Sequence, residues 1–429
     1  MLSAVVAYLL CTPLATPSEL LDYVMKPDAS YSWREASREP RRVDFDLTSQ
    51  TWQGVQWKHT VTLSEPKHRD HDGIAVLVVT GGDPNDEDLR IATAVADRSG
   101  MPCATLFHIP NQPIWNLRED GLIAHTLVKY LETGEPDWPL LFPMTKSVIR
   151  AMDALAEATA KTSNPIKRFV VTGASKRGWT TWLAAATGDA RIAGIAPMVY
   201  DNLNIPAQMN RQIAHWGRYS EMIGDYTDRG LQQILETPRG GRMAKMIDPY
   251  AYRARISAPT LLVIGANDRY WTLDSMSVYW NELRQPHWAV VVPNAGHDLG
   301  DGRLALEGLC AFARACAGEF RMPALECSVR PSAKKVAFEV RTGGTVPVEL
   351  TVWRAQSDSM DFRESKWERA VWIGGESIAQ NKGRTKAAVD RGAAHLAFFV
   401  EARYGIGDRV CSLSTPIRIV PKRETGDRG

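Results

Sequence analysis

Nearly unbroken apolar runs alternate with amphipathic stretches through the middle of the chain. Runs of this kind are typical of strands buried on both faces of a sheet. They occupy residues 74–80, 104–108, 168–172, 192–199, 260–264 and 288–292. Helical patterns fill residues 89–98, 121–132, 145–160, 178–187, 275–283 and 303–317. The alternation predicts an α/β fold, with a mostly parallel sheet that carries helices on both faces.

Two regions depart from this rhythm within the first three quarters of the chain. Residues 43–47 and 60–63 alternate apolar with polar positions, which predicts antiparallel edge strands. Residues 201–252 show no strand pattern but carry aromatic and methionine side chains among polar ones, which predicts a helical cap over the carboxyl edge of the sheet. These side chains either line a substrate pocket or only pack the cap onto the core.

After about residue 318 the pattern changes to short alternating strands without helices. The strand candidates are residues 335–341, 346–353, 370–372, 394–402 and 412–420. This pattern predicts an all-β sandwich. Because 429 residues exceed the usual size of one core, we expect an α/β domain at 18–320 and a β-sandwich module at 321–429.

The N-terminus begins with an apolar run over residues 2–15. The run is too short to span a bilayer but suits the core of a secretory signal peptide, although no Lys or Arg precedes it. We therefore predict a signal peptide at residues 1–17 and a secreted or periplasmic protein. The alternatives are a buried N-terminal helix or strand, or a start codon slightly downstream. No later run reaches the roughly 18 apolar residues of a spanning helix.

Composition and charge exclude several partners. The chain is 44% hydrophobic and 23% charged, with a formal net charge of +2 from interleaved acids and bases. It therefore offers no basic face for nucleic acid and no polybasic run for an anionic membrane.

The six cysteines contain no C-x-x-C pair that would indicate zinc. Cys327 and Cys411 lie near the first and last strands of the C-terminal region and could form a bridge under oxidising conditions. Cys310 and Cys316 fall on different faces of one predicted helix, so we expect buried free thiols. The cluster His68, Asp70, His71 and Asp72 resembles a ligand set, but its polar setting favours a solvated turn. We expect no metal and no cofactor.

The segment with the clearest chemistry is a strand that runs into Gly173-Ala174-Ser175-Lys176-Arg177-Gly178 and then into a helix. A nucleophile elbow has this order, because the serine must sit on a strained turn above the sheet with small residues around it. Gly173 meets that need before the serine. After the serine, Arg177 stands where the G-x-S-x-G pattern has glycine, and Gly178 follows one residue later.

A serine nucleophile needs an imidazole base, and the imidazole needs a carboxylate to orient it. In α/β-hydrolases the order is serine, acid, histidine, each after a strand. Asp268 follows the strand at 260–264, and His297 follows the strand at 288–292. This order predicts a triad of Ser175, Asp268 and His297. The alternatives are Asp201 and Asp274 for the acid, and His215 and His108 for the base.

Acyl transfer also needs hydrogen-bond donors for the developing oxyanion. The backbone N–H of Lys176 comes with the elbow, and Gly81 and Gly82 follow the early strand at 74–80. The two glycines either supply the second donor or form an ordinary turn. The side chains of Lys176 and Arg177 could bind an acidic substrate group, or Arg177 could pair with a carboxylate that holds the elbow.

Several motifs together resemble the PhoPQ-activated pathogenicity-related protein family. The matching stretches are Leu21-Asp22-Tyr23-Val24, Tyr31-Ser32-Trp33, Pro110-Asn111-Gln112-Pro113, Pro143-Met144-Thr145-Lys146, the elbow through Trp179, Asp201-Asn202-Leu203-Asn204, Asp248-Pro249-Tyr250, Pro293-Asn294-Ala295-Gly296-His297, Asp361-Phe362-Arg363 and Trp367. The resemblance implies an α/β-hydrolase fold, export from the cell and an elbow that carries Lys-Arg-Gly after the serine. A peptidase of the dipeptidyl type has been suggested for one branch of the family.

These observations predict an exported serine hydrolase that cleaves an ester or amide bond in a small molecule or peptide. An alternative is a non-catalytic signalling or virulence-related protein that binds a protein partner through its C-terminal module. A third possibility is a carbohydrate-ester hydrolase, in which Trp115, Trp216 and Trp271 stack on sugar rings. Trp216, in the cap, is also a candidate substrate-binding residue.

Overall fold

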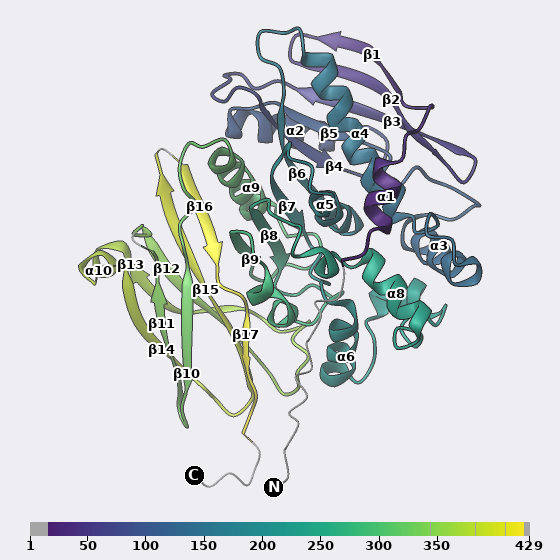
Figure 1. The fold of residues 1–429 in the computed structure, drawn as a ribbon. Helices are drawn as coiled ribbons and strands as arrows, with labels where there is room; N and C mark the ends of the chain where they lie inside the picture. Colours follow the sequence, from purple (N-terminus) through teal and green to yellow (C-terminus); the bar gives the residue numbers. More distant parts are fainter. Residues whose placement is uncertain (1–15, 344, 382, 408, 424–429) are drawn as a thin grey trace, which may run out of the picture.

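The computed structural model describes residues 16–343, 345–381, 383–407 and 409–423 (Figure 1). Nearly all of the predicted signal peptide lies outside these ranges. In the described ranges, no helix has the length and apolar character needed to cross a membrane.

A mixed sheet forms the centre of the molecule (Figure 1). Its first nine strands lie in the order β1-β2-β3-β5-β4-β6-β7-β8-β9. They are β1 (Ser32–Glu39), β2 (Arg42–Trp52), β3 (Val55–Ser64), β4 (Ile74–Val79), β5 (Cys103–Leu106), β6 (Arg168–Ala174), β7 (Ile192–Met198), β8 (Thr260–Gly265) and β9 (His287–Val292). The array from β5 to β9 is parallel throughout, which confirms the six strands predicted from the apolar runs. The strands predicted at 43–47 and 60–63 are β2 and β3, and both are antiparallel. Their predicted edge position is wrong, because β2 also pairs with β1 and β3 also pairs with β5.

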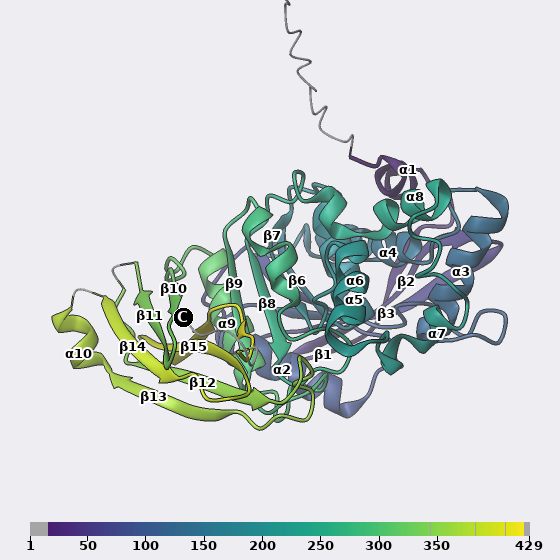
Figure 2. The ribbon, with the colours of Figure 1, turned by 90° about the horizontal axis from the view of Figure 1, so that it is seen from below.

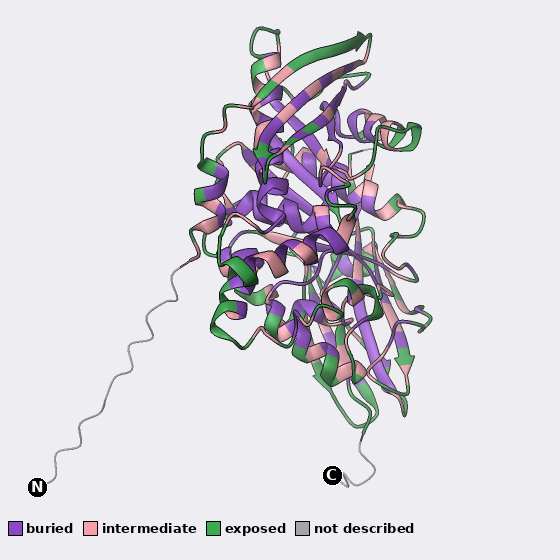
Figure 3. Ribbon diagram, turned by 90° about the vertical axis from the view of Figure 1, so that its right-hand side faces the viewer, coloured by how far each residue is buried: buried purple, intermediate pink, exposed green. Residues whose placement is uncertain are grey.

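Helices cover both faces of the sheet, as predicted. On one face α2 (Asp86–Ser99) packs beside α9 (Arg303–Cys316), and on the other α4 (Leu141–Thr159) packs beside α5 (Lys176–Ala186). The sheet between them is buried (Figure 3). Two further helices complete this part: α1 (Glu19–Met25) against α4, and α3 (Glu119–Thr133) close to the cap.

The helix expected at 275–283 is wrong. The segment forms two short 3-10 turns, η3 (Ser275–Val278) and η4 (Trp280–Glu282). Its serine, valine and aromatic residues are weak helix formers. The hydroxyls of Ser275 and Tyr279 are also committed to the buried carboxylate of Asp201.

The interval between β7 and β8 is helical, as expected for a cap. It contains α6 (Ile205–Trp216), η1 (Glu221–Ile223), α7 (Gly224–Thr227), α8 (Pro238–Ile247) and η2 (Pro249–Tyr252). Buried Asp248 ties the two ends together, because its carboxylate accepts the backbone N–H groups of Asn204, Ile205 and Tyr250 at 2.7–3.1 Å. Burial raises the pKa of Asp248 to about 6.

The C-terminal region consists of two antiparallel sheets (Figure 2). One sheet contains β10 (Glu326–Pro331), β11 (Lys335–Arg341) and β14 (Arg384–Asp390). The other contains β12 (Glu349–Ser357), β13 (Glu368–Gly374), β15 (His395–Ile406), β16 (Arg409–Ser414) and β17 (Arg418–Val420). Stacking of Phe338 on Phe398, with ring centres 6.1 Å apart, links the two sheets as in a sandwich.

The two regions are continuous at one edge. Ser414 of β16 pairs with Ala289 of β9, so the larger C-terminal sheet extends the central sheet. The boundary at 320/321 stays a prediction. The expectation that this region lacks helices is wrong, because α10 (Gly375–Gln380) follows β13. The sequence pattern did not predict β10 and β14, because few of their side chains are buried.

The bridge between Cys327 and Cys411 that oxidising conditions would permit is not formed, and both are free thiols. The physical reason is their placement: Cys327 lies opposite Val340 in the small sheet, whereas Cys411 lies opposite Tyr404 in the large one.

Cys310 and Cys316 are free, as predicted. Cys310 is buried and Cys316 is half-buried.

Candidate active site

Ser175 lies on the turn between β6 and α5 with a strained backbone, at φ 59° and ψ −126°. Its N–H donates to the carbonyl oxygen of Met198 at 2.9 Å. A Cβ on Gly173 would lie 2.8 Å from the carbonyl oxygen of Arg177, and one on Gly178 would lie 2.7 Å from that of Met198. The glycine at 178 therefore lets the start of α5 pack close to β7. In the usual G-x-S-x-G elbow the glycine one residue earlier has this place.

The irregular residue of the elbow, Arg177, links it to two neighbouring loops. Its guanidinium makes two hydrogen bonds of 2.8 Å to Glu119 and donates through Nε to the carbonyl oxygen of Ile109. A Cβ on Gly81 would lie 1.7 Å from the guanidinium, so Arg177 packs directly on the turn after β4. The geometry matches the alternative in which Arg177 pairs with a carboxylate and holds the elbow.

Lys176 extends the same ion-pair network. Its buried ammonium lies 2.9 Å from Oε2 of Glu119 and 3.0 Å from Oδ2 of Asp120. The hydroxyl of Tyr226 donates to the other oxygen of Asp120 at 2.9 Å. Although burial opposes ionisation, the hydrogen bonds and charges of Arg177 and Lys176 lower the pKa of Glu119 to about 2. Both basic side chains of the elbow are thus neutralised within the protein.

The predicted acid and base are in contact. Nδ1 of His297 lies 2.8 Å from Oδ2 of Asp268, and Oδ1 of Asp268 accepts the N–H of Tyr270 at 2.9 Å. The loops that carry them approach closely because position 265 is glycine: a Cβ on Gly265 would lie 2.1 Å from the carbonyl oxygen of Gly296. The carboxylate is therefore oriented by its neighbours before any substrate binds.

The other ring nitrogen, Nε2 of His297, is buried and has no hydrogen-bond partner in the described part of the chain. The ring of Tyr270 stacks on the imidazole with centres 4.2 Å apart. Ser175 Oγ makes no hydrogen bond to His297 within the described contacts. Burial, and then the charges of Asp120 and Asp268, raise the pKa of Tyr270 to about 12.

The alternative acids are committed elsewhere. Buried Asp201 accepts hydrogen bonds from the hydroxyls of Ser275 and Tyr279. Asp274 lies 3.1 Å from Arg211 and 3.6 Å from His215. Its carboxylate therefore faces His215, the alternative base in the cap.

His108 is occupied as well, since its Nε2 lies 2.9 Å from Asp83. Among the candidate acids and bases of the described residues, Asp268 and His297 form the hydrogen-bonded pair, at 2.8 Å, whereas Asp274 and His215 lie 3.6 Å apart without a hydrogen bond.

Strained backbone is concentrated at the carboxyl edge of the sheet. Non-glycine residues with positive φ include Ser175, His108 at 61°, Glu119 at 49°, Val199 at 44° and Asn294 at 56°. A β-branched residue such as Val199 rarely adopts this conformation, and strain of this kind gathers at functional sites. The distribution of strain points to the same edge as the elbow.

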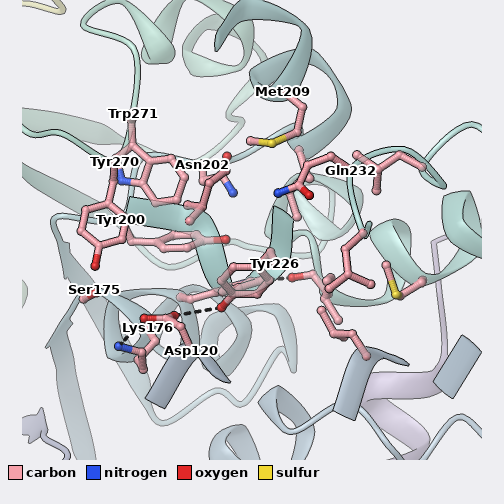
Figure 4. Close-up of a pocket in the computed structure, with 18 residues that line it drawn as sticks. Asp120, Ser175, Lys176, Tyr200, Asn202, Met209, Tyr226, Gln232, Tyr270 and Trp271 are labelled. Carbon is pink, nitrogen blue, oxygen red and sulfur yellow. Dashed lines mark hydrogen bonds and ion pairs between the residues drawn. The ribbon is translucent and has the colours of Figure 1, made fainter. Parts of the chain in front are cut away.

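A pocket opens beside Ser175. Figure 4 shows Ser175, Tyr270 and Trp271 on one side of it and Gln232 on the opposite side. Its apolar and aromatic lining consists of Leu127, Trp179, Tyr200, Ile205, Met209, Ile223, Tyr226, Leu231, Leu235, Met243, Ile247, Tyr270 and Trp271. Most of this lining comes from the cap, so the cap aromatics do more than pack against the core.

The other two tryptophans proposed to stack on sugars lie elsewhere. Trp216 packs under the guanidinium of Arg363 at 4.2 Å and faces a separate cavity behind Asp268. Trp115 is 46% exposed and contacts Trp52. Neither lines the pocket beside Ser175.

Of the residues predicted to donate to the oxyanion, Lys176 lines the pocket beside Ser175, whereas Gly81 and Gly82 line another pocket. Lys176 is the first residue of α5, where backbone N–H groups lack intrahelical acceptors. Gly81 and Gly82 line a more polar pocket with Asp83 and Arg177, on the other side of the elbow. Their role as donors stays a prediction.

No group of three or more histidine, cysteine and acidic side chains placed to hold a metal occurs in the described residues. Within the cluster considered at 68–72, His71 lies 3.0 Å from Glu319 at the end of α9 and ties the loop to that helix.

The sequence matches a known protein family over most of its length. The model of the PhoPQ-activated pathogenicity-related protein family matches residues 20–363. The chain belongs to this family. Autocrine proliferation repressor protein A of Dictyostelium discoideum is 30% identical over 446 residues, which cover 94% of this chain and 88% of that protein.

The fold of this family member is that of the α/β-hydrolases. Acetyl xylan esterase 1 from Thermoanaerobacterium sp. JW/SL YS485 superposes with a TM-score of 0.50 at 16% identity, over 68% of this chain and 91% of that one.

Sequence reasoning missed three residues of the site in this family member. Tyr270 follows Asp268 by two positions, so an aromatic residue beside the acid was a usable signal. Glu119 and Asp120 form an acidic pair at the start of a helix, but nothing in the sequence connects them with Lys176. Their role depends on contacts across more than 50 residues of chain.

Proposed function

We propose that the protein is an exported serine hydrolase that cleaves an ester or amide bond through an acyl-enzyme on Ser175. The observation that carries the proposal is His297, whose Nδ1 is held by Asp268 while its buried Nε2 has no hydrogen-bond partner among the described residues. A general base that awaits the proton of a nucleophile has these properties. Ser175 supports it through its strained elbow beside an apolar pocket.

The reaction follows from these positions. Ser175 Oγ attacks the carbonyl carbon of the substrate, and Nε2 of His297 accepts its proton. The N–H of Lys176 stabilises the oxyanion of the tetrahedral intermediate. His297 gives the proton to the departing alcohol or amine. Water then attacks the acyl carbon, His297 accepts the proton of the water, and it returns a proton to Ser175 Oγ as the acid product leaves. In free enzymes the hydrogen bond between serine and histidine is often long.

The pocket indicates the character of the bound group. Its lining is largely apolar, and Asp120, its acidic residue, is already paired with Lys176 and Tyr226. We therefore expect an uncharged, mainly apolar group to occupy it.

Covalent labelling tests the nucleophile. A fluorophosphonate probe should label the wild-type protein and the exposed-serine control Ser32→Ala, and should not label Ser175→Ala. Folding of all three is checked by circular dichroism. Absence of label on folded wild-type protein, or equal label on Ser175→Ala, would contradict the proposal.

The class of bond needs a separate assay. Purified protein is offered short acyl esters, dipeptide amides and acetylated xylan, the last because an acetyl xylan esterase shares the fold and Trp271 lines the pocket. Turnover that Ser175→Ala abolishes identifies the class.

A second candidate is a non-catalytic binding protein on a hydrolase scaffold. It is favoured by the relative at 30% identity, which is named for repressing proliferation. A biological effect of the protein that survives Ser175→Ala would support binding, and an effect lost in a folded Ser175→Ala protein would support chemistry.

A further inference from the structure

The loop between β12 and β13, residues 358–367, lies against the loop that carries the candidate catalytic acid. Asn267, directly before Asp268, donates its side-chain amide to three carbonyl oxygens of the β12–β13 loop. The acceptors are Phe362 at 3.4 Å, Arg363 at 3.1 Å and Ser365 at 2.8 Å. One side chain of the α/β region thus holds the backbone of the C-terminal region next to the acid.

The same loop also holds the segment that carries the candidate base. Asn294, three residues before His297, donates to the carbonyl oxygen of Trp367 at 3.0 Å and accepts its N–H at 2.8 Å. Asn294 has a positive φ of 56°, so its backbone conformation is unusual as well. This reciprocal pair fixes the start of the turn that presents His297.

A third set of contacts connects the loop to the cap. The guanidinium of Arg363 is buried, lies 2.9 Å from Glu221 and packs over Trp216. Arg269, directly after Asp268, also pairs with Glu221, at 2.7 Å, and with Glu364 of the loop. The loop therefore touches the acid loop, the base loop and the cap at once.

The β-sandwich keeps this loop in one conformation. Phe362 and Trp367 are each 2% exposed, and Trp367 packs on Phe399 of β15 with ring centres 5.1 Å apart. Asp361 accepts both the N–H and the guanidinium of Arg363. A loop anchored by buried aromatic side chains can hold its neighbours in register.

We propose that the β12–β13 loop is a positioning part of the active site, which sets the separation of the Asp268 and His297 loops and fixes the cap beside them. The inference rests on the proposed hydrolase function. It gives the C-terminal region a role in catalysis instead of a role in docking alone, and it places the motif at Asp361–Arg363 and Trp367 next to the triad.

The test removes the two asparagine bridges. In Asn267→Ala and Asn294→Ala we expect the fluorophosphonate labelling rate and kcat to fall about 10- to 100-fold, since a misplacement of about 1 Å can cost 10²-fold. The pH profile of kcat/KM should shift as well, because the orientation of His297 by Asp268 is disturbed. The matched control is Asn381→Ala at the C-cap of α10, whose side-chain amide donates to the carbonyl oxygen of Ser377 at 2.8 Å, far from the triad loops.

Folding and function are separated by further arms. Thermal melting confirms that each variant is folded at the assay temperature. If Asn294→Ala does not fold, Asn294→Asp replaces it, because its carboxylate still accepts the N–H of Trp367 but no longer donates to its carbonyl oxygen. Folded Asn294→Asp should then be labelled more slowly than the wild-type protein. Folded variants with wild-type labelling rate and pH profile would overturn the inference while the hydrolase function stands. A wild-type protein that takes no label would overturn both.

Discussion

The carboxylate of Asp268 divides its oxygens between Nδ1 of His297 and the N–H of Tyr270. In Asp268→Asn the amide can still accept the N–H of Tyr270, but it favours the wrong tautomer of the imidazole. We expect kcat to fall about 10³- to 10⁴-fold with the fold retained. Steady-state kinetics beside Asp274→Asn as control measures the effect. Equal activity of the two variants would exclude Asp268 as the acid.

Asp201 gives a residue-scale prediction about stability. Burial, together with the nearby charges of Asp268 and Asp274, raises its pKa from 3.8 to about 7, despite hydrogen bonds from Ser275 and Tyr279. Between pH 4 and 7 the unfolded chain therefore releases a proton that the folded protein keeps, so stability falls as pH rises.

Relative to Asp201→Asn, the wild-type protein should lose a few kcal/mol of unfolding free energy over that range, since each pKa unit corresponds to about 1.4 kcal/mol. Urea unfolding at several pH values measures the difference. Asp248, whose pKa is also raised, contributes equally to both proteins and cancels. Parallel stability curves would show that Asp201 stays ionised in the folded state.

The candidate triad could be predicted from sequence because order and strand ends define it. Ser175, Asp268 and His297 each follow a recognisable apolar run, and the elbow adds glycines at fixed spacing. Tyr270 and Glu119 could not be predicted in the same way. Their importance comes from a ring stacked on His297 and an ion pair with Arg177, which only the folded chain creates.

At the scale of elements, the junction of β6 and α5 depends on a missing side chain. A Cβ on Gly178 would lie 2.7 Å from the carbonyl oxygen of Met198 and 3.0 Å from Cβ of Tyr200. Gly178→Ala should push the start of α5 away from β7, lower stability by about 1–3 kcal/mol and slow labelling of Ser175.

The matched control for that variant is Gly405→Ala in β15, because an added Cβ there would lie 3.6 Å from Cγ1 of Val348, an ordinary contact distance. Chemical denaturation and probe labelling compare the two proteins. If Gly178→Ala were as stable and as reactive as Gly405→Ala, the close approach would not be needed for the elbow.

Burial explains which elements the sequence predicts. The parallel strands are buried on both faces, so their apolar runs are unbroken and easy to recognise. β1 was missed because most of its side chains face solvent and no apolar alternation remains. The turns at 275–282 were misjudged because side-chain hydrogen bonds to Asp201, which the sequence does not display, decide their shape.

At the scale of the whole molecule, the α/β region and the C-terminal region share the larger sheet, and each of the two hydrophobic core clusters contains residues of both regions. Ser414 pairs with Ala289, and its hydroxyl accepts the N–H of Val291 at 3.0 Å. We therefore expect a single unfolding transition, in which tryptophan fluorescence and far-ultraviolet circular dichroism change together. Two separate transitions in calorimetry would show that the regions unfold independently.

The amide of Asn267 recognises backbone carbonyls of the β12–β13 loop and none of its side chains. Lys366 is exposed, so its replacement would leave this backbone contact in place, whereas Glu364 is exposed but also pairs with Arg269. The length of the loop has no such freedom, because an inserted or deleted residue would move the carbonyls away from the amide. A chimera that exchanges the C-terminal region between relatives should therefore tolerate an altered side chain at the exposed position 366, provided that Phe362, Arg363 and Trp367 are kept, and should lose activity when the loop length differs.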